Sequence, residues 1–278
     1  MNKVVISAAL TGAITTPAES PYIPVTPERI AEDAVKCAKA GAAICHIHVR
    51  DENCIGTMDL DKFEAAYYAA KEALDKEGLD CILNLTTSGG PGDFAKRTAH
   101  LLAIKPEMCS YDAGSLNWAG ETVFMNDPKF LKGLGKITID NKIKPEIEIF
   151  DSNMIRHAKR NFDEGFLEGP LHFQLVMGTW GGMTATVKNL QFLVDQLPEG
   201  STYSVTGIGA GSVPMMMTAL ALGADGIRVG IEDNVFMKKG VLATNEQQVL
   251  RAVELCKIAN REIATAAEAR ELLHFPKR

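Results

Sequence analysis

The segment Ala43-Ile44-Cys45-His46-Ile47-His48-Val49-Arg50-Asp51, residues 43–51, places two histidines in an otherwise apolar run. Its apolar and β-branched residues predict a buried strand, and alternate side chains of a strand point to the same face. His46 and His48 then lie about 6–7 Å apart on one face, where two imidazoles can share a zinc-sized ion. The alternative is a pair of buried histidines satisfied by hydrogen bonds, and this segment alone does not decide between the two.

Short apolar runs of this kind alternate with amphipathic segments along the whole chain. Predicted strands cover residues 4–9, 43–49, 81–86, 108–112, 144–150, 171–176, 203–207 and 225–229. The first predicted helix starts at Pro27 with Thr26 as its N-cap. Further helices are predicted over residues 60–74, 94–103, 127–134, 152–161, 186–197, 212–222, 245–262 and 264–273. Eight βα units without a linker predict an α/β fold, a single (β/α)8 TIM barrel over residues 1–278. A doubly wound sheet is disfavoured, because residues 11–14 lack the G-x-G-x-x-G pattern.

The composition excludes several classes of protein. The net charge is −6 and no basic stripe occurs, so we expect neither nucleic-acid binding nor attachment to an anionic membrane. No apolar run reaches the roughly 18 residues of a membrane-spanning helix. Residues 4–14 look like a short signal peptide, but Thr11 and Gly12 interrupt them, and a first strand explains them better. The six cysteines form no CxxC motif, which favours free thiols and a cytoplasmic location.

Polar residues gather where the predicted strands end, and in a TIM barrel these ends form the active site. They are His46, His48, Arg50, Asp51, Asn84, Thr86, Thr87, Ser88, Ser110, Asp112, Glu146, Glu148, Glu232, Asp233 and Asn234. Structural interpretations exist: residues 86–92 as an ordinary turn, residues 232–234 as a cap, and Glu146 and Glu148 as one ion pair and one solvent-facing acid. Buried acids are costly unless they are paired or bound to a metal. Acids facing two histidines therefore favour a catalytic zinc site with two histidines, one carboxylate and an open position.

Two glycine-rich stretches accompany the last two predicted strands. Residues 205–212 read Val-Thr-Gly-Ile-Gly-Ala-Gly-Ser, and residues 223–230 read Gly-Ala-Asp-Gly-Ile-Arg-Val-Gly. TIM barrels commonly bind phosphate here, through backbone N–H groups and a helix N-terminus. Gly207, Gly209 and Gly211 are therefore candidates for binding a phosphorylated substrate or the phosphates of a nucleotide-containing cosubstrate.

A set of short motifs occurs in one order along nearly the whole chain. They are Thr11-Gly12-Ala13 with Thr16-Pro17, Ile23-Pro24-x-Thr26-Pro27-Glu28, His46-x-His48-x-Arg50, Thr86-Thr87-x-Gly89-Gly90, Lys105-Pro106-Glu107-Met108, Ala113-Gly114-Ser115-Leu116-Asn117, Pro145-Glu146-x-Glu148, Gly181-Gly182-Met183 and Gly230-x-Glu232-Asp233-Asn234. In this ordered set the chain resembles the β-keto acid cleavage enzymes. The resemblance implies a zinc-dependent TIM barrel that condenses a β-keto acid with acetyl-CoA, its cosubstrate, and yields acetoacetate and a new acyl-CoA. It also implies a homo-oligomer, either a dimer or a tetramer.

The resemblance assigns roles to the charged residues that match the family's motifs. It implies that Zn²⁺ is held by His46, His48 and Glu232, and that Asp233 is the catalytic base, oriented by Arg228. The chemistry of these residues agrees with that assignment. A β-keto acid chelated by zinc has an acidified carbon between its two carbonyl groups, and a base directly after a metal ligand lies beside that carbon.

The resemblance also assigns the substrate pocket. Thr86 and Ser110 match hydroxyl-bearing positions that hold the substrate, where they would stabilise developing oxyanions, and Glu148 matches an acid of the same pocket. In the family's lysine-fermentation member, an acid that binds the substrate's amino group occupies the position of Ile14, and a threonine that of Ser110. Ile14 cannot pair with an ammonium, and such a charge-assisted contact is worth on the order of 1.5–3 kcal/mol. We therefore expect Ile14 to line the pocket and the substrate tail to be uncharged.

Two other functions fit the same residues. One is a zinc-dependent aldolase that acts on a phosphorylated substrate without CoA, using the same histidines and the glycine-rich loops. The other is a non-catalytic barrel that kept its zinc and senses a metabolite. The presence of both Asp233 and Arg228 argues against the sensor, because a sensor has no need of a base.

Overall fold

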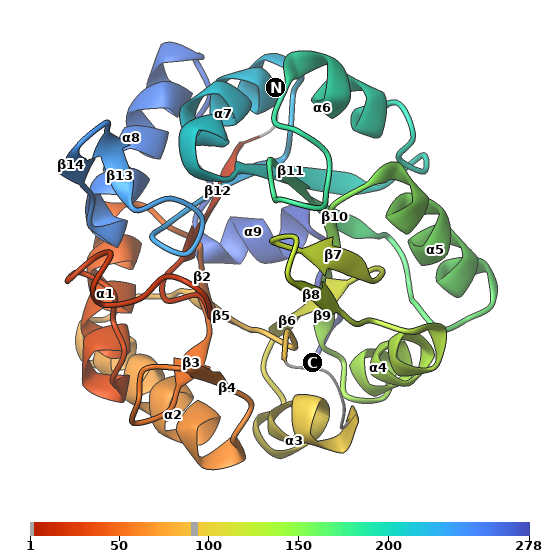
Figure 1. Cartoon of the computed structure of the whole chain (residues 1–278), viewed down its shortest axis with the longest axis horizontal. Coiled ribbons are helices and arrows are strands. Elements are labelled where there is room, and N and C mark those ends of the chain that lie inside the picture. Colours follow the sequence, from red (N-terminus) through yellow and green to blue (C-terminus); the bar gives the residue numbers. More distant parts are fainter. Residues whose placement is uncertain (1–2, 90–93) are drawn as a thin grey trace.

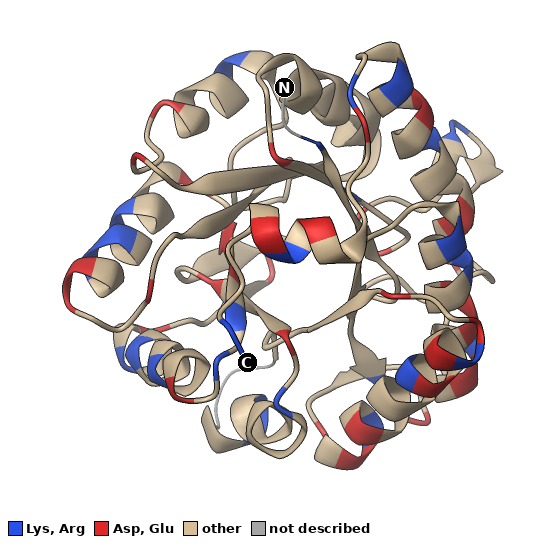
Figure 2. Ribbon diagram, turned by 180° about the vertical axis from the view of Figure 1, so that it is seen from behind, with Lys and Arg blue, Asp and Glu red and all other residues tan. Residues whose placement is uncertain are grey.

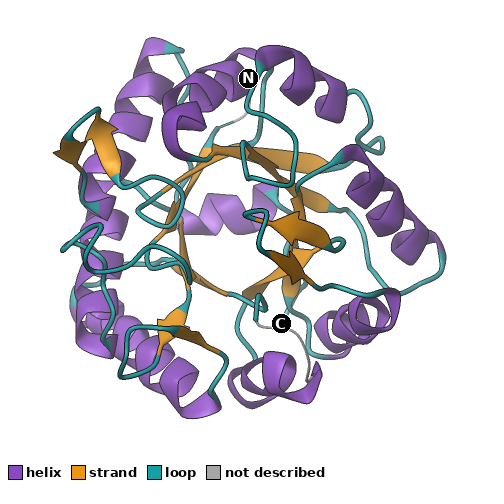
Figure 3. Cartoon of the chain, viewed as in Figure 1, coloured by secondary structure: helices purple, strands orange, loops and turns teal. Residues whose placement is uncertain are grey.

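The computed structural model describes residues 3–89 and 94–278. At its centre, parallel strands close into a barrel in the order β1-β12-β11-β10-β9-β6-β5-β2, with helices around it (Figures 1 and 3). The barrel strands are β1 (Val5–Ala9), β2 (Ile44–Ile47), β5 (Ile82–Leu85), β6 (Met108–Asp112), β9 (Lys144–Ile149), β10 (His172–Met177), β11 (Thr202–Gly207) and β12 (Gly226–Val229). The predicted TIM barrel is confirmed, and each of its eight predicted strands is present.

Helices alternate with the barrel strands, and most of them surround the barrel (Figure 1). They are α1 (Pro27–Ala40), α2 (Leu60–Lys76), α3 (Phe94–Ile104), α4 (Pro128–Asp140), α5 (Ser152–Asp163), α6 (Val187–Val194), α7 (Ser212–Ala221), α8 (Asn245–Ile258), α9 (Ala266–Leu272) and the short 3-10 turn η1 (Gly209–Gly211). As predicted, Thr26 caps α1, because its hydroxyl accepts a hydrogen bond from the Arg29 N–H and Pro27 opens the helix. Within residues 3–89 and 94–278, no helix has the length and apolar character needed to cross a membrane.

Among the described residues, three antiparallel hairpins lie outside the barrel sheet: β3 (Val49–Arg50) with β4 (Gly56–Thr57), β7 (Leu116–Trp118) with β8 (Thr122–Phe124), and β13 (Phe236–Lys238) with β14 (Val241–Leu242). The first hairpin corrects the prediction of one strand over residues 43–49. The barrel strand ends at Ile47, because Val49 and Arg50 pair with β4 and not with β5. Asp51 closes the hairpin turn by accepting two backbone hydrogen bonds at 2.9 Å. His48 therefore lies at the junction between barrel and hairpin.

The helix α9 closes the end of the barrel where the strands begin. Figure 2, seen from behind, shows this helix lying across the barrel. Ala266 and Ala269 of α9, with Leu273 directly after it, form one apolar cluster with residues at the starts of the barrel strands, Val5, Ile44, Ile82 and Met108. The opposite end, where the strands finish, is the end that remains open and carries the hairpins.

The middle of the barrel is polar, whereas apolar layers fill most TIM barrels. Asn84 donates a hydrogen bond to Glu146 at 2.6 Å, and the Ser204 hydroxyl donates one to Gln174 at 2.5 Å. The Nε2 atom of His172 lies 3.3 Å from the same Ser204 oxygen. These pairings reduce the cost of burying polar groups, and they place a polar floor beneath the open end.

We expect the substitution Leu273→Ala to destabilise the fold by opening the sealed end. Leu273 is 1% exposed and packs in the cluster beneath the barrel, so its truncation should lower the free energy of unfolding by about 2–5 kcal/mol. Chemical denaturation measures the change. The matched control is Glu271→Ala, an exposed position on α9, which should change stability by no more than about 0.5 kcal/mol. Equal stability of the two variants would contradict the sealing role of Leu273.

Candidate active site

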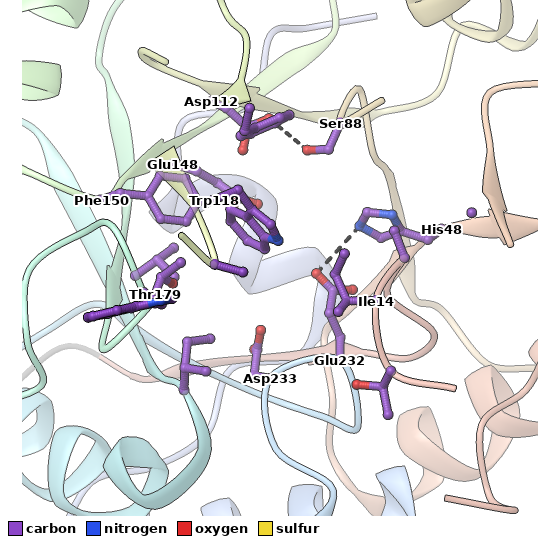
Figure 4. A pocket seen from close by; sticks show the side chains of 18 of the residues that line it. Ile14, His48, Ser88, Asp112, Trp118, Glu148, Phe150, Thr179, Glu232 and Asp233 are labelled. Atoms are coloured by element: carbon purple, nitrogen blue, oxygen red, sulfur yellow. Dashed lines mark hydrogen bonds and ion pairs between the residues drawn. The ribbon is translucent and has the colours of Figure 1, made fainter. Parts of the chain in front are cut away.

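A cavity of about 1140 Å³ occupies the open end of the barrel. Charged and polar side chains form part of its wall, and Figure 4 shows His48, Asp112, Glu148, Glu232 and Asp233 around it. The remaining wall is largely apolar and aromatic, formed by Ile14, Trp118, Phe124, Phe150, Val176, Trp180 and Phe236. A cavity of this size with a few convergent polar groups is typical of a small-molecule site.

Two histidines and one glutamate meet at the side of this cavity. His46 comes from the end of β2, His48 from the junction with β3, and Glu232 from the loop after β12. The Nε2 atoms of His46 and His48 lie 3.8 Å and 3.4 Å from the same oxygen of Glu232, Oε1. Residues almost 190 positions apart in sequence therefore come together as one possible donor set, the set of three that the family resemblance implied.

This donor set fits a divalent metal ion. Donor atoms of His46, His48 and Glu232 all lie within 4.8 Å of one another. Burial lowers the pKa of His46 to about 3, so its imidazole is neutral, which is the form that binds metals. His46 Nδ1 and Glu232 Oε2 are buried without a hydrogen-bond partner in the described part of the chain. Two imidazoles and one carboxylate are ligands that zinc prefers, with a further position left for substrate or water.

The guanidinium of Arg228, from β12, contacts the acids of the site. Its Nη1 lies 3.0 Å from Glu148 and 4.0 Å from Glu146, both on β9. Its Nη2 lies 2.5 Å from Glu232, and Nε and Nη2 bind the two carboxylate oxygens of Asp233 at 2.9 and 3.0 Å. Both glutamates of β9 are buried, so neither is the solvent-facing acid that the structural interpretation allowed.

The buried acids titrate differently because their surroundings differ. Burial raises the pKa of Glu148 well above its usual value and that of Glu146 to about 7. Burial also raises the pKa of Asp233, although Arg228 opposes the change. Burial alone would raise the pKa of Glu232 too, but His48 and Arg228 together hold that pKa well below its usual range. Glu232 is therefore ionised, as a metal ligand must be.

Asp233 lies beside the donor set and is fixed on both sides. Arg228 binds both of its oxygens, and the Thr206 hydroxyl donates to Oδ2 at 2.9 Å. The residue lines the cavity, so its carboxylate faces the space where a substrate would lie. The family resemblance implied that Arg228 orients Asp233, and the structure adds Thr206 as a further hydrogen-bond partner of Asp233.

Some of the other residues predicted to bind substrate line the cavity, and others do not. Glu148 and Ile14 line the cavity, and the Ile14 side chain is 65% exposed (Figure 4). Thr86 and Ser110 are not among the described residues of its wall. The Thr86 hydroxyl accepts from the Ser88 N–H at 3.0 Å, and the Ser110 hydroxyl accepts from the Thr87 N–H at 2.9 Å. These two hydroxyls therefore brace the loop after β5, and this geometry does not support a direct contact with substrate. Gly90, in the motif of that loop, lies outside the described residues, as do residues 91 and 92.

The glycine-rich loop after β11 uses its donors within the protein. The Gly209 N–H donates to the Asp233 carbonyl at 2.8 Å, and the Gly211 N–H donates to the Ile208 carbonyl at 3.0 Å. Gly207 lies beneath the start of α7, where an added Cβ would be 2.3 Å from the Gly211 oxygen. Gly209 lines the cavity, but the bonded N–H groups of Gly209 and Gly211 are not free for a phosphate. This arrangement does not support the predicted phosphate site and instead couples the loop to Asp233.

Sequence analysis missed the aromatic wall. Trp118 and Phe124 come from the hairpin β7–β8, and their rings meet edge to face with centroids 5.8 Å apart. Trp180 reaches this hairpin from the loop after β10, where its carbonyl accepts from the Ala119 N–H. The sequence does contain a pattern that predicts this hairpin, because two short stretches, residues 116–118 and 122–124, flank a turn at Gly120. Their place at the cavity depends on the barrel and could not be read from the segment.

Comparison with known proteins supports one family. A sequence model described as "beta-keto acid cleavage enzyme" matches residues 3–275. The 3-keto-5-aminohexanoate cleavage enzyme of Fusobacterium nucleatum is 39% identical over 278 residues, covering 100% of both chains. The 3-dehydrocarnitine:acetyl-CoA trimethylamine transferase of Rhizobium meliloti is 34% identical over 100% of this chain and 99% of its own.

A solved structure agrees with the fold. The ternary complex of ObcA with C4-CoA adduct and oxalate matches with a TM-score of 0.80, over 92% of this chain and 68% of that chain. Its sequence identity is 24%, so the similarity concerns the fold alone. The family match and both sequence relatives, in contrast, extend over the whole barrel and the loops of its open end. The chain therefore belongs to the β-keto acid cleavage enzyme family.

Proposed function

We propose that this protein condenses a β-keto acid with acetyl-CoA and cleaves the product to acetoacetate and a new acyl-CoA, and that it uses zinc held by His46, His48 and Glu232. The observation that carries the proposal is the meeting of this donor set with the pair Arg228–Asp233 at one cavity. Membership of the family and the acetyl-CoA in the name of the Rhizobium relative support the cosubstrate.

Asp233 is the proposed base. A divalent ion bound by the donor set would polarise the ketone and carboxylate oxygens of a β-keto acid and acidify the carbon between them. Asp233 follows Glu232 directly and faces the cavity, so its carboxylate is placed to take the proton from that carbon. Arg228 and Thr206 hold both carboxylate oxygens in place, which keeps the base oriented.

The proposed reaction balances without any further reactant. The deprotonated carbon attacks the acetyl carbonyl of acetyl-CoA, a carbon–carbon bond forms, and the CoA thiolate leaves. The thiolate then attacks the original ketone of the substrate, and the bond between that ketone and the adjacent carbon breaks. Acetoacetate departs with the electron pair and regains a proton, and the substrate's acyl group remains on CoA.

A screen of β-keto acids with and without acetyl-CoA separates this proposal from the two alternatives. Acetoacetate that forms only when both reactants are present supports the proposal. Cleavage of a phosphorylated substrate without CoA would support the zinc aldolase, although the internal bonds of Gly209 and Gly211 weigh against a phosphate at that loop. Bound zinc without turnover of any β-keto acid would support the metabolite sensor.

We expect one divalent ion per chain, zinc by preference, and we expect His48→Ala to lose both the ion and the activity. His48 supplies one of three donors, and catalytic zinc sites rely on three protein ligands. Elemental analysis of the purified protein measures the metal. The matched control is His157→Ala, an exposed position on α5 that should keep the wild-type zinc content. A wild-type protein without metal, whose activity is indifferent to chelators, would end the zinc proposal.

The substitution Asp233→Asn should keep the fold and the zinc but reduce turnover by roughly 100-fold or more, the scale of a lost general base. Exchange of solvent deuterium into the carbon between the two carbonyl groups should slow in parallel. Zinc analysis and thermal unfolding serve as controls, and the exposed Asp195→Asn should turn over as wild type. If Asp233→Asn turns over normally, another residue is the base, and Glu148 is the next candidate in the cavity.

The third expectation concerns the substrate tail. Wild type should prefer β-keto acids with uncharged tails over 5-amino-3-oxohexanoate, because Ile14 offers no charge at the cavity wall. Ile14→Glu should shift the ratio of kcat/KM toward the amino substrate by about 10-fold or more, since a charge-assisted hydrogen bond exceeds about 1.4 kcal/mol. Ile14→Leu is the matched control and should keep the wild-type ratio. A wild type that already prefers the amino substrate would show that another acid, Asp112 or Glu148, binds the ammonium.

A further inference from the structure

Arg50 is a buried arginine whose charged group binds only backbone carbonyls among the described residues. It lies on β3, two residues after His48, and is 4% exposed. Its Nε and Nη2 donate to the Gly12 carbonyl at 3.1 and 2.7 Å, Nη2 also donates to the Thr11 carbonyl at 3.1 Å, and Nη1 donates to the Cys54 carbonyl at 2.9 Å. The guanidinium thereby links the hairpin β3–β4 to the loop that follows β1.

The loop that Arg50 holds, residues 11–14, lies against a ligand of the proposed metal site. Gly12 has a positive φ of 61°, and an added Cβ there would lie 2.8 Å from Cγ and 3.2 Å from Cα of Glu232. On the other side of the loop, a Cβ added to Gly56 of β4 would lie 2.8 Å from the Cβ of Ala13. Residues 11–14 are therefore packed between the hairpin and Glu232, with no space for a side chain at either glycine.

From these contacts we propose that Arg50 is a positioning residue that sets the place of Glu232 in the metal site and of Ile14 at the cavity wall. The loop contacts Glu232 through Gly12 and places Ile14 at the cavity wall two residues later. The hydrogen bonds from Arg50 to this loop therefore affect the positions of both side chains. The planar fork of an arginine reaches carbonyls on two segments at once, which the single ammonium of a lysine does not. The proposed effect on Glu232 requires only that the donor set binds a metal ion. The proposed effect on Ile14 rests on the proposed function, because it assumes that Ile14 lies against the substrate tail.

Arg50→Lys tests the effect on the metal site without an activity assay. The apo-protein is titrated with zinc in competition with a chromophoric chelator. We expect zinc affinity to fall by about 10-fold or more, as is typical when a residue that supports a ligand is lost. The matched control is Arg97→Lys. Arg97 is also buried and also donates to backbone carbonyls, but it holds the loop after β5 and makes no described contact with residues 11–14 or Glu232. Its variant should bind zinc as wild type.

A second variant, Arg50→Ala, distinguishes positioning from general support of the fold. Guanidinium ion added below its denaturing concentration should enter the vacated space and restore zinc affinity, while methylammonium at equal concentration should not.

In assays of acetoacetate, the preference of wild type for uncharged over amino tails should narrow in Arg50→Lys, because Ile14 is no longer held at the wall.

Three results would overturn the proposal. One is an Arg50→Lys variant with wild-type zinc affinity. Another is an Arg50→Ala variant that is less stable but binds zinc normally where it is folded. The third is a loss of zinc binding that guanidinium does not restore, which would show only that the fold needs Arg50. If wild type forms no acetoacetate, the proposed function fails, but the zinc titration still tests the positioning of Glu232.

Discussion

The arrangement of the open end depends on the ion pairs of Arg228. Four carboxyl groups, Glu146, Glu148, Glu232 and Asp233, lie within 4.0 Å of this one guanidinium, and all are buried or nearly so. Acids so close together repel one another strongly in a low-dielectric interior unless cations balance them. One arginine balances part of this charge, and burial raises the pKa of both glutamates of β9, which favours their neutral form. The remaining anionic character lies at Glu232, beside two imidazoles, where a divalent ion would complete the balance.

Close approach of backbones is the second condition for this site. Gly12 packs on Glu232, and Gly230, with φ of 140°, packs on Ala9, where an added Cβ would be 2.0 Å from the carbonyl oxygen. These two close contacts bring the loop after β1 against the loop after β12. The strands β1 and β12 are neighbours in the closed barrel. Ile14 is therefore held by the same contacts that hold Glu232. The proposed metal site and the proposed wall for the substrate tail would then be parts of one packed unit.

The cavity divides into a charged side and an aromatic side, which suits a reaction with two unlike reactants. The charged side holds the donor set and Asp233, and it fits the β-keto acid head group, whose oxygens are anionic or polar. The aromatic side, with Trp118 and Phe150 from different segments, offers apolar surface that would suit the acyl group of a thioester.

The sequence by itself determined the barrel, the ordered motifs and the pairing of His46 with His48, because these depend on local patterns, whereas Glu232 joins the two histidines only in the folded barrel. Apolar runs of strand length alternating with amphipathic helices leave few folds, and histidines two residues apart at a strand end point to one side whatever the rest of the chain does. Spacing within a segment predicted the elements but not all of their ends. The strand predicted over residues 43–49 divides at His48 into barrel and hairpin, and the helix predicted over residues 245–262 ends at Ile258.

Tertiary structure alone decided which polar groups face the cavity. Thr86 and Ser110 stand at strand ends like Glu148, yet their hydroxyls bind neighbouring N–H groups while Glu148 reaches Arg228. The glycine loop after β11 likewise turns its donors inward, to Asp233 and Ile208. The hydrogen bonds from Arg50 to the carbonyls of Thr11 and Gly12 join segments that are nearly 40 residues apart in sequence. A hydrogen bond of this kind depends on how two distant backbone segments approach each other in the closed barrel. Local sequence patterns do not predict that approach.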